Sequence, residues 1–148
     1  MVSAEFDETV ALRALVESVP QLVGRVGVGS APTSGDGNVL TPPYAVITQS
    51  NEATETDRFS SPVASRRPSW IFHAVGTTEL GAVQVLGWID ERLRPGGRGV
   101  VPVVPGRATK RITRLERPGN AEDNAVQPSV WYAIAVYGFE SNPARPTT

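Results

Sequence analysis

The sequence predicts an α+β domain in which two helices pack on a mainly antiparallel, mixed sheet of about four to five strands. Apolar residues recur with helical spacing in only two segments of the chain. Segments rich in β-branched and aromatic residues follow one another around these helices instead of alternating with them. The 14 glycines and 13 prolines gather mostly between those segments, which predicts long, stiff loops.

The first helix is expected over residues 6–19. Its apolar positions follow the i, i+3, i+4, i+7 spacing of one helix face and are Leu12, Leu15, Val16 and Val19. Asp7 places a carboxylate in the first turn, where it complements the helix dipole. Pro20 ends the pattern, since proline cannot donate the next helical hydrogen bond.

The second helix is expected to begin after Thr78, whose hydroxyl can cap it, and to end at about residue 93 or 94, before a Pro-Gly-Gly sequence. Its core stripe is expected to be Ala82, Leu86, Ile89 and Leu93. Trp88 lies off this stripe, on the flank that it shares with Gly81 and Arg92. An aromatic residue in that place either covers the edge of its own sheet or contacts another subunit.

Five segments have the composition of strands: residues 25–28, 44–48, 69–75, 110–115 and 129–139. In the last and strongest, Tyr132 and Ile134 belong to one face, and Trp131 and Tyr137 belong to the other. A strand that is apolar on both faces is either central in its sheet or covered by a partner on its second face. We expect one domain over residues 1–140 and an extended or frayed tail over 141–148.

Composition excludes several classes of protein. A net charge of −1 argues against a free-standing nucleic-acid binder, although residues 92–117 are rich in arginine. The absence of cysteine excludes disulfides and thiolate metal sites. No apolar run is long enough to span a bilayer, and the first residues lack the pattern of a signal peptide. We therefore expect a soluble protein made in the cytoplasm, with no membrane partner.

No catalytic or cofactor motif is found. His73 is the only histidine; no Gly-x-Ser-x-Gly elbow accompanies it, and its place within a strand predicts a packed or half-exposed ring. A Gly-Val-Gly sequence at residues 27–29 lacks the final glycine of a dinucleotide site, because Pro32 stands there. The acidic pairs at 90–91 and 122–123 and the single Gly-Gly-Arg-Gly sequence at 96–99 carry no specific signal. We predict no enzymatic activity, no cofactor and no bound metal.

Four segments carry a resemblance to a known family: ALRALVESVPQLVGRVGVGSAP at 11–32, PPYAVI at 42–47, WIFHAVGTTELGAVQVLGWIDERL at 70–93 and DNAVQPSVWYAIAVYGF at 123–139. Their order resembles that of the tail terminator, or tail completion, proteins of long-tailed bacteriophages, over about residues 10–139. The resemblance implies a ring, usually a homohexamer, that caps the tail tube, stops its polymerisation and joins the head connector. DNA would pass through the lumen without sequence-specific binding. The location implied is the neck of the virion, assembled in the host cytoplasm.

This hypothesis assigns two sets of contacts. The predicted subunit interface consists of residues that are apolar off the core stripe or belong to a long loop: Gly81, Trp88, Arg92, Val100, Val101, Val103, Val104, Trp131 and Tyr137. The predicted contact with the major tail tube protein or the connector lies in the loop before the third strand: Asn51, Glu52, Glu55, Asp57, Arg58, Arg66 and Arg67. The alternatives are another neck component (a stopper or head-tail adaptor), a small non-viral binding module, or an enzyme that uses His73.

Overall fold

The computed structural model describes residues 3–50 and 65–144 and confirms the α+β class. Helix α1 spans Ala4–Glu17 and helix α2 spans Glu79–Leu93, and short 3-10 turns η1 (Pro20–Leu22) and η2 (Pro95–Gly97) follow them. The strands are β1 Val26–Val28, β2 Tyr44–Gln49, β3 Ser69–Gly76, β4 Arg107–Thr109, β5 Thr113–Glu116, β6 Ala121–Asp123, β7 Val130–Gly138 and β8 Ser141–Pro143. In this part of the chain, no helix is long and apolar enough to cross a membrane.

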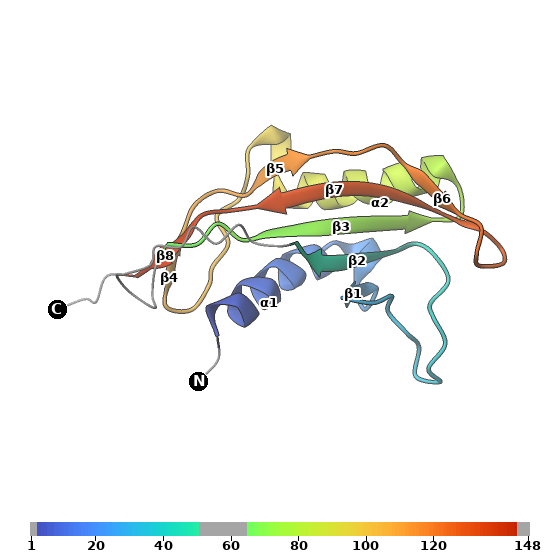
Figure 1. Ribbon diagram of the computed structural model, residues 1–148, viewed down its shortest axis with the longest axis horizontal. Coiled ribbons are helices and arrows are strands. Elements are labelled where there is room, and N and C mark those ends of the chain that lie inside the picture. Colours follow the sequence, from blue (N-terminus) through green and yellow to red (C-terminus); the bar gives the residue numbers. More distant parts are fainter. Residues whose placement is uncertain (1–2, 51–64, 145–148) are drawn as a thin grey trace.

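The main sheet has six strands in the order β1-β2-β3-β7-β5, and β6 also pairs with β7 (Figure 1). Only the pairing of β1 with β2 is parallel. Strand β7 is central: β3 pairs with one of its edges, and β5 and β6 share the other. A second, two-stranded sheet is formed by β4 and β8. Of the two positions that the sequence left open for residues 129–139, the strand pairing shows the central one.

Both helices pack on the same face of the main sheet. Leu12 of α1 and Ile89 of α2 belong to one buried cluster with Phe72 of β3 and Tyr137 of β7. Alternate residues of the three central strands enter this cluster and are fully buried: Ala45, Ile47, Trp70, Phe72, Ala74, Ala133, Ala135 and Tyr137. The alanines allow α2 to approach the sheet closely, and the aromatic side chains fill the space beneath both helices.

Polar atoms inside this core have partners. The Tyr137 hydroxyl donates to Asp90 Oδ1 of α2 at 2.7 Å, and Trp70 Nε1 donates to Thr9 Oγ1 of α1 at 3.1 Å. Thr78 caps α2 as predicted, since its Oγ1 accepts from the backbone N–H of Gly81 at 3.0 Å. Each helix is therefore tied to the sheet by a side-chain hydrogen bond as well as by apolar contact.

The predicted strand at 110–115 is confirmed only at 113–115, within β5. Residues 107–109 and 113–116 belong to two different sheets, and the chain crosses between them at 110–112. The backbone N–H of Ile112 donates to Val100 O at 2.9 Å, and the N–H of Lys110 donates to Glu140 O at 2.9 Å. These bonds with loop residues replace a continuous strand ladder, so the segment turns at its centre.

Two further expectations are corrected near β7. The polar sequence of residues 117–128 predicts a loop between two of the five strand segments, but β6 lies within it and pairs with the first residues of β7. The C-terminal segment is extended as expected but is not frayed over 141–143, because β8 pairs with β4 and Ser141 is fully buried. Both strands are short and polar, so pairing with a neighbour rather than composition determines them.

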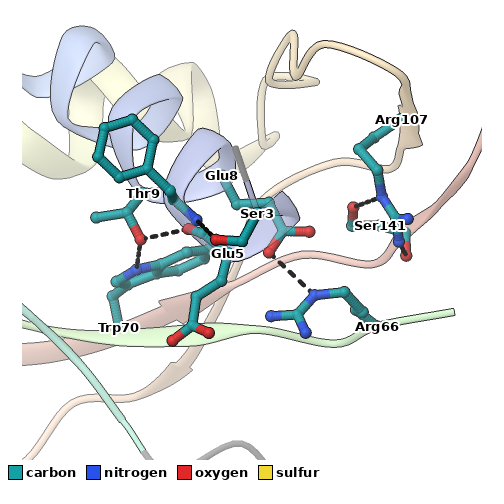
Figure 2. Close-up of polar contacts among 9 residues, drawn as sticks. Ser3, Glu5, Glu8, Thr9, Arg66, Trp70, Arg107 and Ser141 are labelled. Atoms are coloured by element: carbon teal, nitrogen blue, oxygen red, sulfur yellow. Dashed lines mark hydrogen bonds and ion pairs between the residues drawn. The ribbon is translucent and has the colours of Figure 1, made fainter. Parts of the chain in front are cut away.

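A buried carboxylate joins α1 to this small sheet (Figure 2). Glu8 is fully buried, and its Oε1 lies 3.2 Å from Arg66 Nε. The backbone of Arg66 exchanges two hydrogen bonds with Ser141 of β8, at 2.8 and 2.9 Å. Arg107 of β4 donates to the Ser141 hydroxyl from Nε at 2.9 Å. The first turns of α1, the entry to β3 and the β4–β8 sheet therefore form one unit.

This ion pair yields a stability prediction. Glu8→Gln should lower the free energy of unfolding by on the order of 3 kcal/mol, because it leaves the Arg66 guanidinium beside a neutral group in a buried place. Glu5→Gln is the matched control, since Glu5 is exposed on the same helix, and it should change stability by less than about 0.5 kcal/mol. Urea unfolding followed by circular dichroism measures both. Equal losses in the two variants would contradict the structural role of the ion pair.

Candidate functional site

The face of the main sheet opposite the helices is apolar and incompletely buried. Seven residues that alternate with the core residues along β2, β3 and β7 are half-buried, whereas Tyr44 and Val75 on the same face are buried. The seven are Val46, Thr48, Ile71, His73, Tyr132, Ile134 and Val136. We call this set the open face. The strand register arranges it in rows across the sheet, with Val46, His73 and Ile134 in one row. Within the described residues, no helix covers it.

A hollow of about 310 Å³ lies on the open face where β2 begins. The rings of Tyr44, His73 and Tyr132 line it together with Val46, Thr48 and Ala31. Ala31 reaches this position because the turn after β1 folds back tightly on the strand. A Cβ at Gly27 would lie 2.0 Å from the Ser30 carbonyl oxygen, so only glycine permits this turn. The wall of the hollow thus depends on the sequence of β1.

The polar groups of the hollow are neutral at physiological pH. Burial lowers the pKa of His73, whose ring meets Tyr132 edge-on with the ring centroids 5.7 Å apart. The Tyr132 hydroxyl donates to Asp123 Oδ2 at 2.9 Å; burial, then this bond and the charge of Asp123, raise the pKa of Tyr132 to about 12. Burial, then the charge of Asp123, also raise the pKa of Tyr44. The carboxylate of Asp123 therefore acts on both tyrosines of the hollow.

This arrangement suits docking better than proton transfer. In residues 3–50 and 65–144, no hydrogen bond joins His73 to a carboxylate or to a hydroxyl nucleophile. The same residues hold no group of three or more histidine and acidic side chains able to bind a metal ion. A broad apolar surface with a few neutral polar groups is typical of protein contact surfaces. The open face is accordingly our candidate functional site.

The structure removes two residues from the predicted subunit interface. Tyr137 is fully buried under α2, and Val104 is 4% exposed, so neither can contact another subunit. The alternation of side chains along β7 correctly placed Tyr137 and Tyr132 on opposite faces of the sheet. The face that carries Tyr137 is the one that the helices cover, so this side chain is enclosed. Trp131 lies on that same side, half-buried against the core, and Val100 is also packed against the core.

The remaining predicted interface residues lie in three places. Trp88 and Arg92 of α2 border a shallow hollow of about 260 Å³ beside Pro20, and Arg92 Nε donates to Ser18 Oγ at 2.6 Å. Gly81 lies in the first turn of α2, against the capping threonine. Two residues of the loop after η2 are exposed, Val101 by 49% and Val103 by 88%. The structure does not bring these three groups together with the open face.

Most of the predicted tube or connector contact lies outside the described residues, namely Asn51, Glu52, Glu55, Asp57 and Arg58. Arg66 is half-buried and pairs with Glu8, so its Nε serves the fold. Arg67 is exposed and borders a third hollow, of about 330 Å³, with Lys110 and Leu115. The hollow that Tyr44, His73 and Tyr132 line was not predicted from the sequence. The alternation of side chains that identified two faces in β7 applies equally to β2 and β3.

Comparison with known proteins supports the fold alone. No protein-family model matches the sequence, and no curated protein matches it. A solved structure that carries no functional name is similar, with a TM-score of 0.51 and 14% sequence identity. The match covers 94% of this chain and 98% of the other. The described architecture therefore occurs over the whole length of another chain of comparable size.

His73 gives stability a pH dependence of defined sign. Burial favours the neutral ring, so its folded pKa lies below its unfolded value of about 6.5. The unfolded chain takes up the proton first as the pH falls, and the free energy of unfolding should decrease from about pH 7 until the folded pKa is passed. His73→Phe should remove this decrease in the free energy of unfolding as the pH falls. Urea unfolding at several pH values measures it, and an unchanged decrease in the variant would assign the effect to another group.

Proposed function

We propose that this protein is a phage tail terminator, a structural subunit that forms a ring on the tail tube, stops its polymerisation and joins it to the head connector. The observation that carries the proposal is the open face. Large apolar surfaces are uncommon on proteins that act as single soluble chains, and they mark sites of association. Here the surface occupies the centre of the sheet, where β3 and β7 pair over their whole length.

A ring imposes a geometric condition that the chain can meet. Subunits of a ring contact one another through two different surfaces, since each subunit must bind a neighbour on either side. The open face supplies one apolar surface, and the exposed valines after η2 supply a second, separate one. The resemblance described from the sequence supports the placement at the tail tube, with DNA passing through the lumen.

The main alternative is another component of the phage neck, such as a stopper or a head-tail adaptor. The same open face would then contact a connector protein rather than the tube. Catalysis by His73 has less support, because among the described residues its ring packs edge-on against Tyr132 and forms no hydrogen bond with a hydroxyl nucleophile. A small non-viral binding module would use the same surface for an unrelated partner.

Disruption of the gene in the phage that encodes it tests the proposal. We expect tails of irregular, excessive length that do not join to heads, because nothing would stop the growing tube. Wild-type protein supplied from a plasmid should restore tails of normal length, as should Val39→Lys, which changes an exposed loop residue. Thr48→Lys should fail to restore them, because it places a charge in the hollow.

Electron microscopy of negatively stained lysates measures tail length and head attachment, and circular dichroism confirms that both variants fold. Tails of uniform length that remain attached to heads in the disrupted strain would contradict any role in the neck. Uniform tails separated from full heads would contradict the terminator and favour a stopper or adaptor.

A further inference from the structure

We infer that the open face is occupied by a second copy of this chain, and that the segment 99–104 of that copy docks on it. The inference deepens the proposed ring by naming the two surfaces that meet, and it rests on that proposal for the idea that the subunits assemble. Three observations carry it: the rigidity of the segment, its match in spacing to the open face, and the opposite charges around the two surfaces.

In the segment 99–104, two valines exposed to solvent alternate with buried residues. Val101 and Val103 are 49% and 88% exposed, whereas Pro102 and Val104 between and after them are buried. An isolated exposed valine is common on proteins, but exposed valines at alternate positions form a continuous apolar ridge. The valine-rich sequence of residues 100–104 is thus divided between the core and this ridge.

The ridge is fixed in place by backbone contacts. Val100 N donates to Leu93 O, and Ile112 N donates to Val100 O, both at 2.9 Å. The Thr109 hydroxyl donates to the Pro102 carbonyl, and Arg111 Nη1 donates to Gly99 O at 3.0 Å. Gly99 lies so close to the chain that a Cβ there would be 1.8 Å from Ile112 O. A ridge held in this way loses little conformational entropy on docking.

The ridge and the open face have the same spacing. Alternate side chains of an extended chain are about 6.6 Å apart. Val101 and Val103 have this separation in sequence, and so do neighbouring rows of the open face, as with Val46 and Thr48 on β2. Valine side chains can therefore lie between successive rows without either surface changing its backbone.

The charges around the two surfaces are opposite. Residues 98–111, which include the ridge, contain four basic residues and no acidic one: Arg98, Arg107, Lys110 and Arg111. The segments that form and border the open face, residues 26–50, 69–78 and 118–138, contain no lysine or arginine but carry acidic residues at Asp36, Glu122 and Asp123. Arg25 and Arg117 adjoin these segments, and each donates to their backbone carbonyls. Contact between ridge and face is therefore attractive, whereas contact between two faces brings like charges together.

One chain cannot make this contact with itself. Val104, beside the ridge, packs in the core on the helix side of the sheet, and the hollow lies on the other side. Figure 1 also shows the loop between η2 and β4 toward the end of the molecule where β8 lies, while β2 and β7 begin toward the opposite end. The contact is head-to-tail between copies, and such contacts give a closed ring when the rotation between copies closes.

The absence of cysteine from the sequence allows a direct test. Two single variants, Val103→Cys on the ridge and Thr48→Cys in the hollow, are mixed under oxidising conditions over a range of concentrations. A disulfide forms only where the Cα atoms approach within about 7 Å. We expect a linked dimer from this mixture at a yield about tenfold above that from Val23→Cys mixed with Thr48→Cys. Val23 is the matched control, because it is also an exposed valine, at 67%.

The double variant Val103→Cys/Thr48→Cys should give a series of disulfide-linked oligomers, and the largest of them should contain as many subunits as the ring. Equal yields in the control mixture, or dimers formed mainly by Val103→Cys alone or by Thr48→Cys alone, would overturn the inference. A photo-reactive label on Thr48→Cys in assembled tails gives a second readout. Linkage of that label to a different virion protein, or to DNA, would also overturn it.

The cross-linking experiment and the gene-disruption experiment have independent outcomes. A series of linked oligomers from a protein whose loss leaves tails normal would retain the contact between copies and reject the terminator. Irregular tails in the disrupted strain, with linkage no higher than in the control, would retain the terminator and reject the contact between ridge and face.

Discussion

The main sheet has two apolar faces, and the described chain supplies helices for only one of them. This constraint determines most of the structure. α1 and α2 both pack on the face that carries Phe72 and Tyr137, so most of the aromatic and aliphatic residues on the opposite face are only half-buried. The turn after β1 covers one corner through Ala31 and leaves a hollow beneath it. A fold of this kind has one enclosed core and still keeps an apolar surface that is only partly covered.

The covered face is stabilised at both ends by polar contacts that the apolar core alone would not supply. At one end, Tyr137 and Arg94 both bind the carboxylate of Asp90. Burial raises the pKa of Asp90, but the bonds from Tyr137 and Arg94 outweigh it, so the net shift is downward and the group stays charged. At the other end, Glu8 ties α1 to Arg66 and through its backbone to β8. Both contacts hold the helices in fixed positions and so define which face remains open.

The sequence was sufficient for the features that depend on local periodicity. Helical spacing located both helices, and alternation in β7 identified two apolar faces, because burial on each face selects the residues at every second position. It was not sufficient for β8, whose Ser-Asn-Pro sequence has no strand preference and is ordered by pairing with β4 and by the bonds of Ser141. Nor did alternation show that Tyr137 lies beneath a helix, since helix placement is a property of tertiary packing. The hollow was missed for the same reason.

The size of the open face bears on the strength of the contact that we propose between copies of the chain. Complete burial of side chains that are already half-buried contributes about 1 kcal/mol each, and the open face has four such aliphatic residues: Val46, Ile71, Ile134 and Val136. Association costs at least about 4 kcal/mol in lost translational and rotational freedom. The free energy gained by one contact of this size is therefore about equal to the free-energy cost of association. In the proposed ring, copies that were also held by the end of a tube would meet at a high effective concentration, and the same weak contact would then suffice to close the ring.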